Sequence, residues 1–240
     1  MKPTEEEKSK IRKLADKVEG WLTYKEGETL YDLAKKCTGK GVIVEIGSWK
    51  GKSTIWLAKG SKRGNRPRIY AIDPHKSTSV HEKYDKDWTF NEFKENIIKL
   101  NVNDIITPIV KTSEKAVKNF NKPIELIFID GSHEYDQVKS DFRLWVPKVI
   151  DGGIMAFHDT IFWPGPKKVV EEFVYKSRNF RNTKFVDSIT FAEKVAQNSF
   201  QDRVRNIYVL SLKNLYEFVR SLSFLEPFIP VARRIIRIIH

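Results

Sequence analysis

The chain has 240 residues, enough to bury one large hydrophobic core, and its 43 Lys and Arg residues outnumber 31 Asp and Glu residues. The resulting charge of +12 is spread along the sequence, which favours an anionic substrate or partner and argues against a specific nucleic-acid site. A single cysteine, Cys37, excludes an internal disulfide, and the sequence shows neither an apolar N-terminal signal nor an apolar run of spanning length, so we expect a cytoplasmic protein.

The first 40 residues predict amphipathic helices. Apolar residues between positions 11 and 18 fall on one helical face, and a second amphipathic stretch runs from about Thr29 to Lys36. Lysines in its last turn and Gly39 just beyond it are typical of a helix C-terminus. We therefore expect residues 1–40 to form N-terminal helices.

From residue 41 the pattern changes to short apolar runs that alternate with longer amphipathic ones. Five such strand–helix units favour an α/β fold with a doubly wound, mostly parallel Rossmann-like sheet and helices on both faces. A following stretch, TKFVDSITFAEKV, predicts a closing antiparallel strand pair. We expect this domain to span residues 41–196. Its five apolar runs are VIVEI, RIYAID, DIITPIV, IELIFID and GGIMAFHD.

Residues 197–240 predict a C-terminal helical extension. In its last ten residues, VARRIIRIIH, the arginines share one helical face and the apolar side chains share the other. Such a helix can lie on an anionic membrane or cover a second subunit, so peripheral membrane contact and homodimerisation through the C-terminal helices are both predicted. Packing against its own domain is the alternative.

The strand ends carry the candidate ligand-binding residues, because open α/β sheets bind ligands outside the carboxyl ends of their strands. The first run continues as EIGSWKGKST, whose end resembles a P-loop, but only three residues separate Gly47 from the Gly-Lys pair instead of four. Asp73 ends the second run, 26 residues after Gly47, where a carboxylate can accept hydrogen bonds from a ribose diol. A nucleoside ligand is therefore favoured. A non-catalytic nucleoside-binding module and a P-loop-like nucleotide hydrolase remain alternatives.

Four segments in register after successive strands, EIGSWKGKS, YAIDP, KTSEKA and LIFIDGSHEY, resemble class I S-adenosylmethionine-dependent methyltransferases. The resemblance spans about residues 20 to 195 and is greatest to small O-methyltransferases of the catechol, macrolide and sugar type. It implies S-adenosylmethionine as cofactor and a hydroxyl of a small molecule or saccharide as acceptor. The cofactor-binding residues that it implies are Glu45, Gly47, Ser48, Gly51, Ser53, Asp73, Ser113 and Asp130.

Within that resemblance, each of these side chains has an expected place. Glu45 and the Gly47 turn would lie beside the methionine amino group, and Ser53 would bind the carboxylate at a helix N-terminus, where free N–H groups favour anions. Asp73 would bind the ribose, Ser113 would reach the adenine, and Asp130 would lie beside the transferable methyl group.

The DGSHEYD segment places His133 three residues beyond Asp130, and the resemblance implies that a basic side chain here is the general base, with Asp130 as the second catalytic residue. Helix capping is the alternative role for His133. Asp130, His158 and Asp159 predict a divalent-metal site; related metal-dependent enzymes carry an acidic residue where this chain has His158, so manganese or iron is favoured over magnesium. Hydrogen bonding within the sheet end is the alternative. We expect His75 and His81 to be solvated or to face the substrate.

Overall fold

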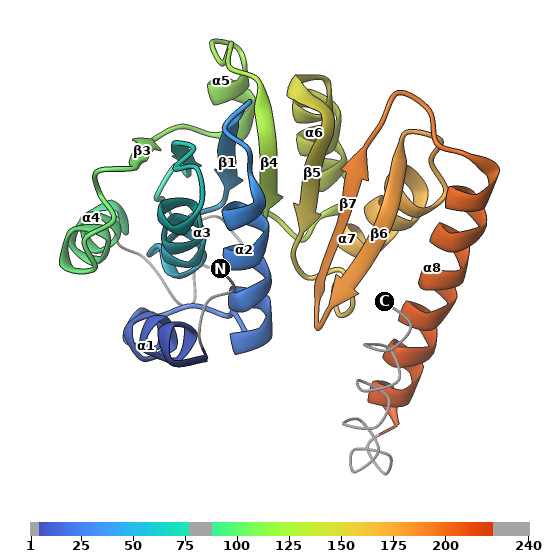
Figure 1. Ribbon diagram of the computed structural model, residues 1–240, viewed down its shortest axis with the longest axis horizontal. Coiled ribbons are helices and arrows are strands. Elements are labelled where there is room, and N and C mark those ends of the chain that lie inside the picture. Colours follow the sequence, from blue (N-terminus) through green and yellow to red (C-terminus); the bar gives the residue numbers. More distant parts are fainter. Residues whose placement is uncertain (1–4, 77–87, 223–240) are drawn as a thin grey trace.

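The computed structural model describes residues 5–76 and 88–222, and its centre is a seven-stranded sheet in the order β3-β2-β1-β4-β5-β7-β6 (Figure 1). The first five strands pair in parallel, and β7 pairs antiparallel to both β5 and β6. The predicted α/β fold, with its parallel sheet and closing antiparallel pair, is confirmed. The strands are β1 (Val42–Ile46), β2 (Ile69–Ile72), β3 (Ile106–Ile109), β4 (Ile124–Ile129), β5 (Val149–Phe157), β6 (Phe180–Val186) and β7 (Ile189–Lys194).

Helices cover both faces of the sheet, and each face has its own hydrophobic core. Successive side chains of a strand point to opposite faces. In β1, Ile43 packs with the helices α1 to α4, whereas Val44 and Ile46 pack with α5 to α8. Apolar residues on both faces explain why the strands appear in the sequence as continuous apolar runs. The helices are α1 (Glu5–Ala15), α2 (Tyr24–Lys36), α3 (Lys52–Arg63), α4 (Phe90–Lys99), α5 (Ser113–Val117), α6 (Tyr135–Trp145), α7 (Pro164–Val170) and α8 (Phe200–Ser221), with the short helical turns η1 (Val146–Lys148) and η2 (Glu171–Tyr175).

Helix α2 begins at Tyr24, five residues before the predicted amphipathic stretch. Thr23 caps it: the Thr23 hydroxyl accepts from the backbone N–H of Glu26, and the Glu26 carboxylate accepts from the backbone N–H of Thr23. This reciprocal capping box satisfies two N–H groups that a helix start leaves open. The sequence interpretation began the helix at Thr29 because it followed the apolar periodicity alone. The earlier start brings Glu26 into the interior, where its side chain is buried.

Helix α8 follows the antiparallel strand pair and packs on β6 and the π-helical turn η2 at the edge of the molecule (Figure 1). It also begins with a capping box, formed by Ser199 and Asp202. The basic segment at residues 231–240 lies outside the described residues. Within the described ranges, no helix is long and apolar enough to cross a membrane.

Candidate functional site

A cavity of about 880 Å³ opens at the carboxyl ends of β1, β2, β4 and β5, where the sequence predicts the ligand. Small-molecule pockets measure roughly 300–1,000 Å³, so this volume has room for a nucleoside cofactor beside a second small molecule. Ser48, Ser53, Asp73, Ser113 and Asp130 all line it. With Gly47, the sheet therefore brings together six of the eight predicted cofactor-binding residues at one surface, and Glu45 and Gly51 do not line it.

The loop after β1 is held tightly against the neighbouring strand end. Gly47 has a φ of 85°, and a Cβ there would lie 2.2 Å from the carbonyl oxygen of Asp130, so only glycine fits. Gly51, at φ 93°, caps α3 without a side-chain hydrogen bond. The hydroxyl of Ser48 is buried and lines the cavity, and no residue of the described ranges bonds to it. An open helix N-terminus and an unpartnered hydroxyl fit an anionic, hydrogen-bonding ligand group.

Glu45 lies beneath this loop and does not line the cavity. Thr54 donates a hydrogen bond to one carboxylate oxygen, and the other oxygen has no partner in the part of the chain that the structure describes. Burial raises the pKa of Glu45 to about 8, although hydrogen bonds from Ser53 and Thr54 work against the shift. Glu45 is therefore placed to support the loop from below.

Asp73 joins the end of β2 to the loop after β1, residues 47–51, which we call the glycine loop. Its two carboxylate oxygens accept backbone N–H groups, one from Trp49 at 2.8 Å and one from His75 at 2.6 Å. Of the two places expected for His75, the solvated one is wrong, because its ring is buried against Phe90 and Phe93 and its Nδ1 contacts the Thr89 hydroxyl. His75 does line the cavity, so a place facing the substrate stays a prediction. Burial lowers the pKa of His75. His81 lies outside the described residues.

Ser113 begins α5 at the opposite end of the cavity, where its hydroxyl accepts the indole N–H of Trp145 at 2.8 Å. Asp141 of α6 lines the same end. Burial raises the pKa of Asp141 to about 6, against a hydrogen bond from Ser113. The sequence did not single out Asp141, because it lies inside an amphipathic helix rather than at a strand end.

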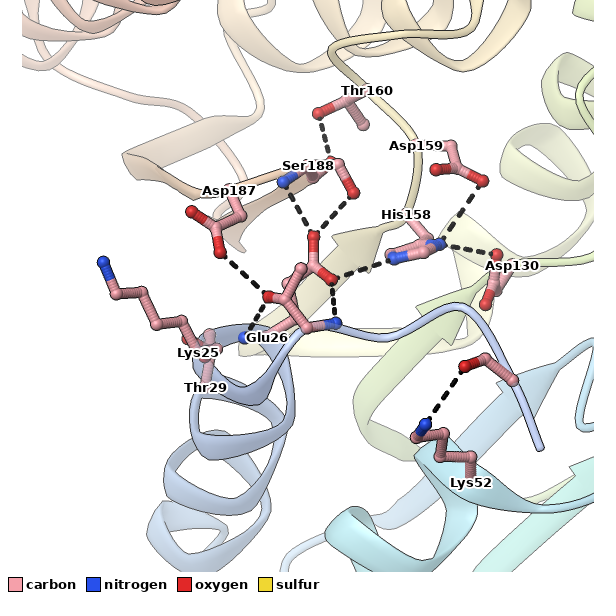
Figure 2. Close-up of polar contacts among 12 residues, drawn as sticks. Lys25, Glu26, Thr29, Lys52, Asp130, His158, Asp159, Thr160, Asp187 and Ser188 are labelled. Carbon is pink, nitrogen blue, oxygen red and sulfur yellow. Dashed lines mark hydrogen bonds and ion pairs between the residues drawn. The ribbon is translucent and has the colours of Figure 1, made fainter. Parts of the chain in front are cut away.

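His158 lies at the centre of a cluster of carboxylates (Figure 2). Its Nδ1 is 3.1 Å from Asp130 and 3.4 Å from Asp159, and its Nε2 is 3.4 Å from Glu26 of α2. Burial alone would lower the pKa of His158, but these carboxylates raise it well above the usual range. Loss of water around Asp130 raises the pKa of that carboxyl, although the charge of His158 works against that shift.

His133 lies at the cavity side of the cluster. Its Nε2 is 2.7 Å from an oxygen of Asp159, and its ring stacks on Trp163 with centroids 4.1 Å apart. Burial would raise the pKa of Asp159, yet bonds from His133 and His158 hold it well below its usual range. The first turn of α7 packs close to this histidine, since a Cβ on Gly165 would lie 2.1 Å from the His133 carbonyl oxygen. The pair therefore has a fixed orientation at the cavity surface.

Comparison with known proteins agrees with this geometry. A family model described as a methyltransferase domain matches residues 44–160, the segment that holds the glycine loop, Asp73, Asp130 and the His158–Asp159 pair. Residues 44–160 therefore form a methyltransferase domain. Neither the nucleotide hydrolase nor the pure binding module is favoured by this match.

Individual relatives of this methyltransferase domain are distant. An uncharacterized protein of Acanthamoeba polyphaga mimivirus is 31% identical over 120 residues, which are 48% of this chain and 50% of the relative, so the chain spans about half of its length. The O-methyltransferase NovP has a TM-score of 0.61 at 16% identity, over 73% of this chain and 83% of NovP. An O-methyltransferase from Bacillus cereus, solved in complex with SAH, has a TM-score of 0.57 at 16% identity, over 81% of this chain and 93% of that structure. These structural likenesses show the shared fold.

The donor set at the methyltransferase site fits a divalent cation. In the described ranges, Asp130, His158 and Asp159 each offer one ligand atom, and these atoms lie within 4.8 Å of one another. Glu26 is directed at the second ring nitrogen of His158, as outer carboxylates commonly are for metal-binding histidines. Hydrogen bonds between His158 and the same two aspartates are the alternative arrangement of the cluster.

The sequence interpretation missed Glu26, which precedes His158 by 132 residues. One signal for it was present: Thr23 and Glu26 have capping-box spacing. That spacing predicts a helix start, but not that the same carboxylate also accepts the backbone N–H and the hydroxyl of Ser188 and reaches His158.

We predict a pH-dependent stability difference between the cofactor-free parent protein and Glu45→Gln. In the unfolded chain Glu45 ionises near pH 4.5, whereas in the fold it keeps its proton to about pH 8. Between these values the folded state binds more protons, so the parent loses stability as pH rises, by up to about 1.4 kcal/mol per pH unit relative to the glutamine variant. Urea unfolding of both proteins from pH 5 to 9 measures this. Glu95→Gln, on the exposed side of α4, is the control, and parallel pH curves for parent and Glu45→Gln would contradict the prediction.

Proposed function

We propose that this protein transfers the methyl group of S-adenosylmethionine to a hydroxyl oxygen of a small molecule or saccharide. The observation that carries this proposal is the His133–Asp159 pair, joined at 2.7 Å, on the wall of the cavity that also holds the glycine loop and Asp73. O-methyl transfer needs a base for the acceptor proton, and an imidazole oriented by a carboxylate is a common way to supply one.

The cavity offers a matching group for each part of the cofactor. Ser48, Ser53 and the N-terminus of α3 suit the methionine carboxylate. Asp73 suits the ribose diol, because a carboxylate that accepts two backbone N–H groups still has lone pairs for hydroxyl donors. Ser113 and Asp141 suit the polar edge of the adenine at the far end. Glu45, one layer below, acts by holding the loop.

Methyl transfer from a sulfonium is an in-line displacement with a good leaving group, so the enzyme mainly aligns the two reactants and removes the hydroxyl proton. In our proposal His133 keeps its Nε2 proton, which is hydrogen-bonded to the Asp159 carboxylate, and takes the acceptor proton on its other ring nitrogen. The negative charge of Asp159 stabilises the imidazolium that results. The proton leaves the oxygen as the carbon–oxygen bond forms, and the sulfonium becomes a neutral thioether.

Aromatic surfaces beside the pair suit an acceptor with an apolar face. Trp163 stacks on His133, and Trp21 stacks on Trp49 with centroids 4.9 Å apart; all four residues line the cavity. Sugar rings and phenols both present such faces next to hydroxyl groups. A divalent cation held by Asp130, His158 and Asp159 would orient such a hydroxyl and lower its pKa.

The ribose assignment predicts that Asp73→Ala weakens S-adenosylmethionine binding by about 1.5–3 kcal/mol, the range for hydrogen bonds to a charged group. Titration calorimetry of parent and variant measures this, with ATP and NAD as alternative ligands. Asp151→Ala, at the exposed opposite end of β5, is the matched control. Equal affinity of the parent and Asp73→Ala for S-adenosylmethionine would contradict the nucleoside assignment. If the parent bound ATP or NAD more tightly than S-adenosylmethionine, that ligand would become the assigned cofactor.

The base assignment predicts that His133→Ala lowers turnover by about 10² to 10⁴ while cofactor affinity stays near that of the parent, since general-base catalysis has that size and acts in the transition state. The assay supplies a panel of phenols and monosaccharides and measures the thioether product. Parental turnover in His133→Ala would exclude it as the base. A parent that binds the cofactor but methylates no member of the panel would support a binding module instead.

The metal assignment predicts that Mn²⁺ or Fe²⁺ binds the purified protein more tightly than Mg²⁺, because imidazole prefers borderline cations. Paramagnetic resonance of Mn²⁺ reports binding independently of activity. His158→Asp, which restores the acidic residue of related enzymes, should shift the preference toward Mg²⁺, and Asp159→Ala should weaken both ions. Absence of Mn²⁺ binding, or full activity after exhaustive chelation, would reject the metal.

A further inference from the structure

Helix α8 is apolar on two opposite faces. One face packs on the domain through Val209, Leu210 and Tyr216. The opposite face points away from the sheet at the edge of the molecule (Figure 1), and its large apolar side chains are 44–71% exposed. A helix that packs on one domain needs only one apolar stripe, so the outer stripe calls for a second contact. The exposed residues are Phe200, Val204, Ile207, Tyr208, Leu215 and Phe218.

The outer stripe has a spacing that reads the same in both directions. Within α8 its positions include 204, 207, 211, 215 and 218, so that the intervals run 3, 4, 4, 3 about Ser211, with Tyr208 at the side. At 100° per residue these five positions fall on one face together with Phe200. A contact between two identical surfaces across a two-fold axis requires this kind of self-complementarity. The pattern therefore selects a second copy of the chain as the occupant.

A two-fold axis at Ser211 pairs large residues with large residues. In an antiparallel arrangement Ile207 meets Leu215 of the second copy, and Val204 meets its Phe218. At the centre, Ser211 is small, and its hydroxyl donates to the Ile207 carbonyl at 3.1 Å, so it needs no partner across the axis. A small residue at the crossing point lets two helices approach closely.

Charge does not oppose this contact. Among the described residues of α8, Arg203 is the only charged side chain within about 90° of the stripe centre, taking 100° per residue. Arg203 is bonded to the Asn198 carbonyl at 3.2 Å and lies over the ring of Phe200. The antiparallel arrangement places the two copies of Arg203 at opposite ends of the contact.

We propose that this protein forms a homodimer in which α8 packs antiparallel against α8 of a second copy, with the two-fold axis at Ser211. A helix of 22 residues is about 33 Å long. Covering the stripe on both copies buries on the order of 1,000 Å², near the lower bound for a specific interface. This dimer leaves the cofactor cavity open, because no residue of α8 lines it.

Cysteine cross-linking of the full chain tests the register. The only natural cysteine, Cys37, is buried, so any cross-link that forms on oxidation comes from the introduced cysteines. Ser211→Cys should form a disulfide-linked dimer on mild oxidation, since the axis brings its two copies within bonding distance. Val204→Cys alone and Phe218→Cys alone should not, because each pair of equivalent residues lies about 20 Å apart along the helix axis. A mixture of these two variants should cross-link.

Sedimentation measures the mass without oxidation. The 28.0 kDa chain should sediment at twice its mass, and Ile207→Glu should return it to the monomer, because the symmetry places two like charges in the contact. Ile98→Glu is the matched control: it is 58% exposed on α4 and should leave the dimer intact. A monomeric parent, including one that binds anionic vesicles through the stripe, overturns the proposal. So does a dimer that Ile207→Glu leaves unchanged, or self-linking of Val204→Cys equal to that of Ser211→Cys.

Discussion

The buried imidazole of His158 is the interaction on which the rest of the site depends. It lies among three carboxylates that come from separate parts of the chain: Glu26 from α2, Asp130 after β4 and Asp159 after β5. His158 and Glu26 are buried and would be expensive to bury alone, whereas Asp130 and Asp159 keep part of their surface exposed; the one imidazole faces all three carboxylates. The cluster thus joins the N-terminal helices to the edge of the sheet where the cavity opens.

Further contacts connect the His158 cluster to neighbouring parts of the fold. Glu26 also accepts two hydrogen bonds from Ser188 in the turn between β6 and β7, so the closing strand pair is tied to the same carboxylate. On the other side of the cluster, Asp159 is hydrogen-bonded to His133, and the ring of His133 stacks on Trp163. His133, which we propose as the base, its partner Asp159 and the aromatic ring of Trp163 are therefore positioned by one continuous set of contacts. Removing one partner would leave the others buried without compensation.

Much of the fold could be predicted because it depends on local patterns. Five apolar runs separated by amphipathic ones determine a parallel sheet, and the topology then brings their end residues, among them Asp73, Asp130 and Asp159, to one edge. Glu26 could not be found this way, since its contact with His158 joins residues 132 apart. The burial of His75 was missed for the same reason: the rings of Phe90 and Phe93 cover it only once α4 has packed. The sequence predicts correctly that Glu45 lies in the first strand. That its side chain lies below the glycine loop rather than in the cavity depends on the hydrogen bond with Thr54, which only the packed α3 provides.

The close approach of Gly165 to the backbone of His133 has a consequence for how the enzyme can diverge. Any side chain at position 165 would collide with the His133 carbonyl, so the first turn of α7 has no freedom to shift relative to the base. Of the residues between Asp159 and Trp163, Thr160 and Ile161 are buried, and Phe162 alone is exposed, at 55%. Under the proposed function, changes in acceptor preference would therefore fall on Trp163, which lines the cavity and is 42% exposed, by exchange of its side chain rather than by insertion, while the helix behind it keeps its register.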